Sequence, residues 1–368
     1  MVKVSIQIVT WNSLRFLPDC LESIFNQTFR DFSILIIDNA SSDHSVGYLI
    51  RNWPQVKILK NSRNCGYARA HNQGILATDS EYVLVLNPDV ILEPDFLEKI
   101  INEVDKQKKI GSFAPKLLKM KFSHIDHGEH QEQQGAGAAI NPDWCVTKTD
   151  ILDSTGLAIR RTRRVVDRGE GEVDKKQYDK LFDIFGVSGA CVLYRRKALD
   201  DIKLKIFSHY SSAPSASRFS MGERRKSAFR NEYFDEDFHS YQEDIDLAWR
   251  LKWRNWGALY VPEAIAYHVR QVSAMKRFNK SSWVNFLSYR NHLWLLIKNE
   301  PIANFLKDIF HIFFYQSIKI LYLLFTQPGV LLKAEKSFYA KQILMFKKRA
   351  QIFSRAKIKS DKIRKYIN

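Results

Sequence analysis

Four short apolar runs near the start of the chain are the feature that most limits its fold. They cover residues 4–10, 32–37, 56–59 and 82–86, and are rich in valine, isoleucine and leucine. Segments with apolar residues at helical spacing separate them, over residues 14–25, 41–52 and 66–77. Strands that alternate with helices in this way are typical of βαβ units. We therefore predict a Rossmann-like α/β fold, with helices on both faces of a mainly parallel sheet.

Polar clusters follow the predicted strands, at the positions where each strand ends. They cover residues 10–12, 38–43, 61–72 and 87–89. Right-handed crossovers bring the carboxyl ends of parallel strands to one edge of the sheet, where ligands bind in open α/β folds. Asp89 follows Pro88, which ends the last strand because proline has no backbone donor. A carboxylate there can hold a divalent cation against a phosphate, and a simple turn is the alternative.

The residues after the first strand argue against an NAD-binding fold. Such a fold has the pattern G-x-G-x-x-G at that position, whereas this chain has Thr10, Trp11 and Asn12. Asp38, after the second strand, is nevertheless suited to contact a ribose or a base edge, as in nucleotide-binding folds generally.

Four motifs together resemble family 2 glycosyltransferases. They are V-T-W-N (9–12), I-I-D-N-A-S-S-D (36–43), N-C-G-Y-A-R-A-H-N-Q-G (64–74) and L-N-P-D-V (86–90). The strongest likeness is to the bacterial rhamnosyltransferase-like branch, over about residues 3–270. The resemblance implies the GT-A fold in a catalytic domain of residues 1–275. Residues 1–115 would bind the nucleotide sugar, and residues 116–275 would bind the acceptor.

The resemblance also implies roles for the polar clusters. Asp38 would bind the base of the donor, and the segment 64–72 would lie against the base, ribose or diphosphate. The stretch 185–195, in which small residues lead into an apolar strand, would lie beneath the sugar, where glycine allows close approach. The expected donor-binding residues are Thr10, Asn12, Asp38, Asn64, Gly66, Asn72, Asn87 and Gly189. For Asp38 a helix-capping turn is the alternative, and for Gly189 a tight turn without a ligand.

Mg²⁺ or Mn²⁺ on the donor diphosphate follows from the same resemblance. Asn87-Pro88-Asp89 occupies the place of the family's Asp-x-Asp motif, so its first carboxylate is missing and Asp89 is the expected ligand. His268 ends the strand-like run 260–268 and would complete the metal or diphosphate site. A lone histidine with a structural role is the alternative.

A second acidic motif supplies a candidate base. Glu243 and Asp244 stand at the start of a predicted amphipathic helix, where acidic residues also favour the helix dipole. An inverting sugar transfer needs a carboxylate that takes the proton of the acceptor hydroxyl, and the pair matches the family's Glu-Asp signature. We assign the base to Asp244, with Glu243 as the alternative. Asp235 and Asp237 are expected to be loop acids or acceptor contacts.

The C-terminal region, residues 276–368, differs from the rest of the chain. The formal net charge is +17, and residues 341–368 hold ten Lys and Arg against one acid. Apolar residues between 305 and 325 form a broad face without eighteen uninterrupted apolar residues, which favours an in-plane amphipathic helix over a spanning one. A helix packed on the core or on a second subunit is the alternative. We expect this region to bind an anionic membrane surface.

Cysteine usage and the N-terminus bear on the compartment. The four cysteines are far apart and form no C-x-x-C, which fits a reducing cytosol without disulfides or zinc. The N-terminal apolar run is too short for a signal peptide. We therefore expect a cytoplasmic protein, peripheral on the inner face of the bacterial plasma membrane.

The residues and the resemblance together predict a metal-dependent, inverting glycosyltransferase. The donor would be a nucleoside-diphosphate sugar such as dTDP-rhamnose, and the acceptor a glycan or lipid-linked oligosaccharide of a surface polysaccharide of the O-antigen type. A nucleic-acid-binding protein is a rival that rests on charge alone. Because the body of the chain is only mildly basic, we expect no nucleic-acid partner. A metal-dependent phosphohydrolase is the second rival, and the sequence leaves a homo-oligomer open.

Overall fold

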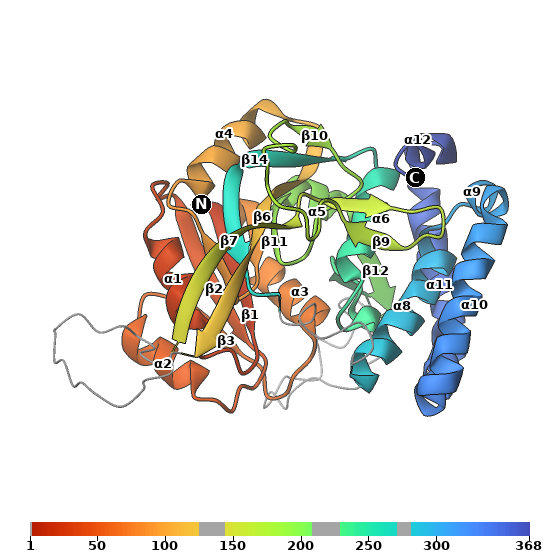
Figure 1. Cartoon of the computed structure of the whole chain (residues 1–368), viewed down its shortest axis with the longest axis horizontal. Helices are drawn as coiled ribbons and strands as arrows, with labels where there is room; N and C mark the ends of the chain where they lie inside the picture. The colour runs from red at the N-terminus through yellow and green to blue at the C-terminus, as the bar shows by residue number, and fades with distance from the viewer. Residues whose placement is uncertain (1, 125–143, 208–228, 271–280) are drawn as a thin grey trace, which may run out of the picture.

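A mixed sheet of ten strands forms the centre of the molecule (Figure 1). The computed structural model describes residues 2–124, 144–207, 229–270 and 281–368. Along the sheet the strand order is β10-β14-β6-β11-β4-β1-β2-β3, with β5 paired to β14 and β7 to β6. The α/β prediction is confirmed.

The first four strands are the parallel part of this sheet. Their bounds are β1 (Val2–Thr10), β2 (Phe32–Asp38), β3 (Lys57–Lys60) and β4 (Ser80–Leu86). The helices between them are α1 (Leu17–Phe25), α2 (Ser45–Asn52) and α3 (Tyr67–Ala77). All four predicted strands and three predicted helices are present. Helix α1 begins three residues later than predicted, with Pro18 in its first turn, where a missing backbone donor costs nothing.

The second part of the sheet adds antiparallel strands. Strand β11 runs antiparallel to both β4 and β6, whereas β14 runs parallel to β6. The strands are β5 (Val90–Leu92), β6 (Ile110–His124), β7 (Trp144–Ser154), β10 (Phe182–Asp183), β11 (Cys191–Arg195) and β14 (Gly257–His268). Two hairpins lie outside it, β8 (Leu157–Ile159) with β9 (Val165–Asp167), and β12 (Leu204–Phe207) with β13 (Phe229–Glu232).

Helices cover both faces of the sheet, as predicted. Along β4, Leu84 and Leu86 pack with α1 and α4 (Phe96–Lys106). The alternate residues Val83 and Val85 face α3, α5 (Arg196–Ile202) and α6 (Glu243–Trp253). Successive side chains of a strand point to opposite faces, so a strand buried on both sides reads as a continuous apolar run.

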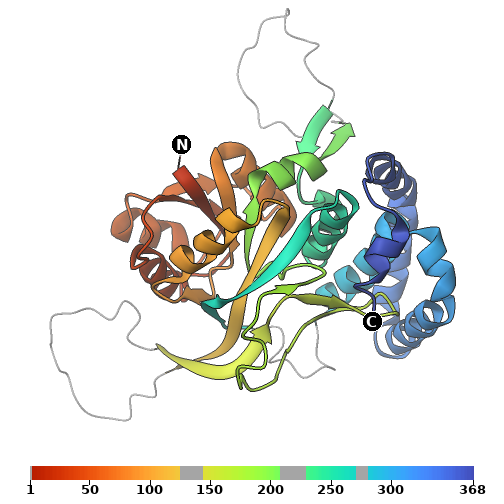
Figure 2. The same ribbon diagram turned by 90° about the horizontal axis from the view of Figure 1, so that it is seen from above.

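A layer of C-terminal helices lies beside this core (Figure 2). It comprises α8 (Ser282–Asn299), α9 (Ile302–Lys307), α10 (Ile309–Thr326), α11 (Pro328–Ser354) and α12 (Ser360–Arg364). Trp294, Met345, Ile352 and Ile363 share one buried cluster with the tryptophans of α6. Residues 341–368 therefore pack on the catalytic core and are not a free basic tail.

Domain limits stay a prediction. The expected boundary at residue 275 falls in 271–280, outside the described residues, and the division after residue 115 falls inside β6.

Helix α10 has 18 residues with a mean hydropathy of 1.4, so by length and composition it is able to cross a membrane. Only 11% of it is buried against the rest of the described protein. The sequence argument against a spanning length therefore does not hold for this helix.

Candidate active site

The predicted donor residues converge on the carboxyl edge of the sheet. Thr10 at the end of β1 is in register with Asp38 at the end of β2, and Ile8 is in register with Leu86 of β4. Because β11 is antiparallel, its first residue, Cys191, lies opposite Leu86, so the preceding Gly189 reaches the same edge. Strand β14 brings His268 opposite Val90, directly after the Asn87–Asp89 turn.

Asp38 and Thr10 each keep a buried oxygen without a partner. The Asp38 Oδ2 atom accepts a hydrogen bond from the amide of Ser41 at 3.1 Å. This hydrogen bond corresponds to the turn that we gave as the alternative role of Asp38. Its Oδ1 atom is buried and has no partner among the described residues, and the same holds for Thr10 Oγ1. Leaving a buried polar atom unpaired costs about 1–3 kcal/mol. A ligand with both a donor and an acceptor at this position would remove that cost.

Three other predicted donor residues shape the surrounding loops. Asn12 adopts φ 51° and its Oδ1 accepts from the amide of Ser42 at 2.8 Å. The Asn64 Oδ1 accepts from the amide of Gly66 at 2.9 Å. Gly66 has φ +84°, and an added Cβ would lie 2.7 Å from the His239 ring, so only glycine fits this turn. Their contacts fix the loop backbone around the edge.

Asn72 is turned away from this edge. Its side-chain oxygen accepts from the amides of Tyr233 and Phe234 at 3.2 and 2.8 Å. Its amide donates to the Phe234 carbonyl at 2.8 Å and to Glu236 at 3.1 Å. Since the side chain is buried and engaged at both ends, Asn72 positions the loop before α6, and we leave it out of the proposed donor contacts.

Asp89 and His268 face each other at the edge. The His268 Nε2 atom lies 3.4 Å from Asp89 Oδ1, and its Nδ1 atom lies 2.8 Å from Asp153 Oδ2. Burial alone would lower the pKa of His268, but Asp89 and Asp153 outweigh it and raise the pKa to about 9. With that pKa both ring nitrogens carry protons near neutral pH, so Nε2 would have to release its proton in order to bind a cation. The contact of Nδ1 with a carboxylate is the arrangement that metal-ligating histidines show.

These residues fit a divalent cation that is shared with a diphosphate. Within the described part of the chain, no group of three or more His, Cys, Asp or Glu side chains could hold a metal alone. Magnesium sites built from one or two protein ligands plus substrate phosphates are common. Asp89 and His268 would supply the protein ligands. Asn87 lies beside them, and its backbone amide donates a hydrogen bond to the Ala190 carbonyl at 2.9 Å.

Asp153 and Arg270 were missed as site residues by the sequence reasoning. Arg270 contacts Asp153 at 3.3 Å, Glu170 at 2.8 Å and also Asp167. Arg270 stands two residues after His268, so its charge could have been noticed next to the predicted metal ligand. Asp153 lies 115 positions away from His268 in the sequence, and nothing local marks it.

The Glu243–Asp244 pair lies at the start of α6, next to the small-residue stretch. Asp244 Oδ2 accepts from the amide of Gly189 at 2.9 Å, and its Oδ1 accepts from the amide of Ile245 at 2.8 Å. The Tyr67 hydroxyl donates to the Gly189 carbonyl at 2.6 Å. The structure thereby joins the predicted base to the predicted sugar-binding wall, across 55 residues of sequence.

The two carboxylates, Glu243 and Asp244, differ in pKa. Burial raises the pKa of Asp244 to about 6. Burial, and then the charge of Asp244, raises the pKa of Glu243 to about 8. Glu243 therefore holds its proton more strongly than Asp244 does. Because a general base has to be deprotonated and should have a pKa near the working pH, these values favour Asp244.

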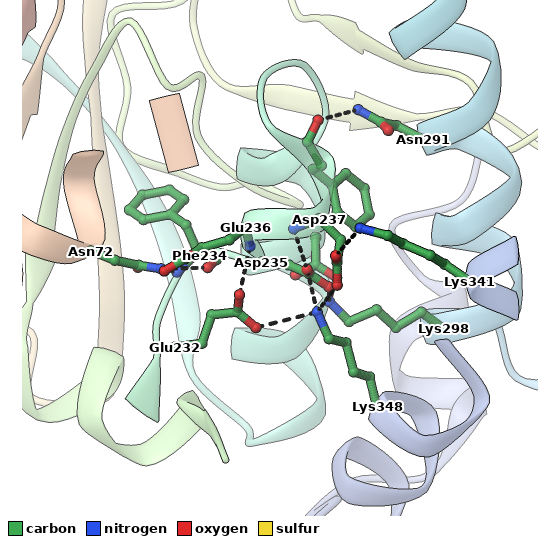
Figure 3. A network of polar contacts seen from close by, with 12 residues as sticks. Asn72, Glu232, Phe234, Asp235, Glu236, Asp237, Asn291, Lys298, Lys341 and Lys348 are labelled. Atoms are coloured by element: carbon green, nitrogen blue, oxygen red, sulfur yellow. Dashed lines mark hydrogen bonds and ion pairs between the residues drawn. The ribbon is translucent and has the colours of Figure 1, made fainter. Parts of the chain in front are cut away.

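A buried ionic network fixes the loop that leads into α6 (Figure 3). Lys348 of α11 contacts Asp235, and also Asp237 and Glu232 at 2.7 and 3.2 Å. Lys298 of α8 contacts Asp235 and Asp246, and Asp246 belongs to α6 itself. Asp235 and Asp237 were expected to be loop acids or acceptor contacts. The structure makes them loop acids that tie the C-terminal helices to the catalytic helix.

Comparison with known proteins identifies the family. The model of glycosyl transferase family 2 matches residues 5–203, more than half of the chain. The chain belongs to glycosyltransferase family 2. It is 24% identical over 308 residues to an N-acetylglucosaminyl-diphospho-decaprenol L-rhamnosyltransferase of Mycobacterium tuberculosis, covering 78% of this chain and 84% of the relative.

Two further likenesses are more limited. A chondroitin synthase of Escherichia coli is 32% identical over 111 residues, which is 29% of this glycosyltransferase and 16% of the relative. A crystal structure of GalNAc-T7 with UDP, GalNAc and Mn²⁺ aligns with a TM-score of 0.52 at 14% identity. That alignment covers 81% of this chain and 48% of the other, and it supports the fold. The predicted family and rhamnosyltransferase-like character are confirmed.

Proposed function

We propose that this glycosyltransferase is inverting and metal-dependent, and that it moves a sugar from a nucleoside diphosphate to a lipid-linked glycan. Rhamnose carried by dTDP is the first candidate donor, because the mycobacterial relative is named as an L-rhamnosyltransferase on a diphospho-decaprenol acceptor. The observation that carries the proposal is the convergence of Asp38, Asp89, His268 and Asp244 on one edge of the sheet. A surface polysaccharide of the O-antigen type is the proposed pathway.

Each group has a defined task in this mechanism. The open Oδ1 of Asp38 and the hydroxyl of Thr10 would bind the nucleotide. Asp89 and His268 would hold Mg²⁺ or Mn²⁺, which when bound neutralises charge on the leaving diphosphate. Asp244 takes the proton of the acceptor hydroxyl while the hydroxyl oxygen attacks the anomeric carbon. The bond from that carbon to the diphosphate oxygen breaks, the diphosphate keeps the electron pair, and the configuration inverts.

A nucleotide-sugar screen tests the proposal. Anything that binds the native state and not the unfolded state raises the unfolding temperature. We expect one nucleoside-diphosphate sugar to stabilise the protein in Mn²⁺, and to lose its sugar only when an acceptor is added. Donor hydrolysis in water at the same rate without an acceptor would instead support a phosphohydrolase.

The first variant concerns the proposed metal ligand. We expect Asp89→Asn to abolish the part of nucleoside-diphosphate affinity that depends on Mn²⁺, while the fold is kept because Asp89 lies at a partly exposed turn. Isothermal titration with dTDP, in Mn²⁺ and in EDTA, measures this. Asp95→Asn is the matched control, because Asp95 is a half-buried acid that directly precedes α4. Unchanged dTDP affinity in Mn²⁺ would remove Asp89 from the site.

Membrane association is proposed through helix α10. Phe310 and Phe325 are 86% and 81% exposed, and burying one such side chain is worth about 1.5–3 kcal/mol. We therefore expect Phe310→Ser/Phe325→Ser to weaken binding to vesicles of anionic lipid by at least about tenfold. The unfolding midpoint should not change. Equal co-sedimentation of variant and wild type would show that α10 is not the anchor.

Deletion of the basic C-terminus would be a poor test of membrane binding. Lys348, Ile352 and Ile363 are buried, so a chain cut at residue 341 would lose part of its core. Some of the C-terminal charge is also paired, since Lys348 contacts Asp235 and Arg364 contacts Asp308 at 2.6 Å. The proposed location remains the inner face of the bacterial plasma membrane. The four cysteines, all free, agree with a reducing compartment.

A further inference from the structure

A cavity borders the catalytic helix on the side of the C-terminal helices. It has a volume of about 490 Å³ and lies between the start of α6, the β8–β9 hairpin, α8 and α10. Gln242 and Ile245 line it, and these residues flank the Glu243–Asp244 pair. The cavity therefore borders the helix turn that carries the proposed base.

The described lining of the cavity is cationic. Arg164, at the turn of the hairpin, is exposed, and Lys319 of α10 lies between the rings of Tyr289 and Tyr315 at 5.5 and 5.6 Å. Arg163 is also present, but its guanidinium is bound to Glu300 and Asp308. No carboxylate is among the lining residues that the structure describes. Such a site favours an anion.

Two buried polar groups in the cavity wall lack a hydrogen-bond partner among the described residues. One is the Nε2 atom of His292, a residue that is 4% exposed. The Oε1 atom of Gln242 is also buried and unpartnered, although its amide donates to the Ser288 carbonyl at 2.9 Å. Buried polar atoms are nearly always paired in proteins. An unpaired histidine nitrogen beside two cationic side chains points to a polar ligand.

The cavity opens beside the apolar face of α10. Ile318 lines the cavity and is 49% exposed. Residues on the same face of a helix recur every three or four positions, and this face continues through exposed residues before and after Ile318. They are Phe310, Phe314, Leu321 and Phe325. A ligand with an anionic head and a hydrocarbon chain would match both surfaces at once.

We propose that this cavity binds the phosphate or diphosphate head of the lipid that carries the acceptor glycan, with its hydrocarbon chain along α10. The inference rests on the proposed function, because it assigns to the acceptor carrier a site that the transfer reaction requires. Arg164 and Lys319 would contact the phosphate oxygens, and the Nε2 atom of His292 would form a hydrogen bond with a polar atom of the ligand at the base of the cavity. The attached sugar would then extend toward Asp244.

Farnesyl diphosphate is a suitable soluble probe. It would be titrated into the full-length protein in EDTA, so that binding of a diphosphate through a metal at the donor edge does not contribute. Farnesol and inorganic diphosphate are the paired probes, since each keeps one half of the ligand. We expect farnesyl diphosphate to bind at least about tenfold more tightly than either.

The variants test where the probe binds. Arg164→Gln/Lys319→Gln should lose at least about tenfold in affinity for farnesyl diphosphate, because charged hydrogen bonds to the phosphate are removed. Arg51→Gln/Lys57→Gln, two exposed cations far from α10, should bind as the wild type does. If the first double variant unfolds, Arg164→Gln alone serves, because that side chain is exposed, and a several-fold loss is expected.

Several outcomes would overturn the assignment. Equal affinity of the wild type and the Arg164/Lys319 variant would place the probe elsewhere. Inorganic diphosphate bound as tightly as farnesyl diphosphate would show a free-phosphate site, and farnesol bound as tightly would show an apolar groove only. The dTDP affinity in Mn²⁺ is measured on the same samples. If no nucleotide sugar proves to be a donor while the probe still depends on Arg164 and Lys319, the proposed function fails, and the cavity remains a site for a lipid diphosphate without the role of holding an acceptor.

Discussion

Replacing Asp244 by asparagine is expected to lower the rate of sugar transfer by about 10² to 10⁴-fold, the usual contribution of general-base catalysis. A sugar hydroxyl is a poor nucleophile at neutral pH, so its proton has to pass to a positioned base. In the native protein the amide of Gly189 donates a hydrogen bond to Asp244 at 2.9 Å. The side-chain oxygen of asparagine can still accept this hydrogen bond, but asparagine cannot take a proton from the acceptor. The fold and donor affinity should persist, and the loss should appear in kcat rather than in KM.

Glu243→Gln is the matched control, because the two neighbours compete for the role. Burial, and then the charge of Asp244, raises the pKa of Glu243 to about 8. Glu243 therefore holds its proton more strongly than Asp244 does, and glutamine resembles this protonated form. We expect this variant to keep most of its activity. If Asp244→Asn transfers sugar normally while Glu243→Gln is inactive, the base is Glu243. If both remain active, the pair only begins the helix.

The pH profile supplies an independent check on the same residue. Burial raises the pKa of Asp244 to about 6, and the base works only when deprotonated. Transfer should therefore rise as the pH increases through about 6 and level off above it. The Asp244→Asn variant should lose this step.

The second large effect concerns stability. Replacing Lys348 by methionine is expected to lower the free energy of unfolding by about 3–5 kcal/mol, the usual cost of breaking a buried ion pair from one side. Lys348 is fully buried among Asp235, Asp237 and Glu232. Together with Lys298, it overcomes the effect of burial and lowers the pKa of Asp235. Without it, these carboxylates lose their shared cation.

Denaturant unfolding measures this change, and the chain offers a close control. Lys347 is the preceding residue of α11 and is exposed, so Lys347→Met should change the free energy of unfolding by less than about 0.5 kcal/mol. Equal stability of the two variants would mean that the network adds nothing to the attachment of the C-terminal helices. A large loss in Lys348→Met alone would show that α11 supports the loop before the catalytic helix.

The sequence predicted those elements that depend mainly on interactions between residues close together in the chain. Strands β2 and β4 are apolar on both faces, β1 is mainly apolar on one face, and all three end in polar turns, so their place and their ligand-binding edge could be predicted. The helix starts were less accurate. The Asp43 carboxylate accepts from the amides of Leu14 and Ser45 and holds the loops before α1 and α2. Such a contact between two loops has no signal in either segment.

Long-range polar contacts were out of reach of the sequence. Asn72 was assigned to the donor because it lies in a family motif, whereas its side chain holds the loop 233–236. Lys348 belongs to the basic C-terminal stretch that we expected at a membrane surface, yet it lies in the core. Asp153 was not assigned to the site from the sequence, and it contacts His268. In each case the partner is more than 100 positions away, so only the folded chain shows the pairing.

The stereochemistry of transfer tests the central claim most directly. The enzyme would be incubated with the nucleotide sugar that the thermal-shift screen selects, Mn²⁺, and an N-acetylglucosaminyl diphospho-lipid of the kind named for the mycobacterial relative. The anomeric configuration of the product would then be read by NMR. A single displacement with Asp244 as base predicts a glycoside inverted relative to the donor, formed by the wild type and lost in Asp244→Asn. A product with retained configuration, or free sugar alone, would contradict the account.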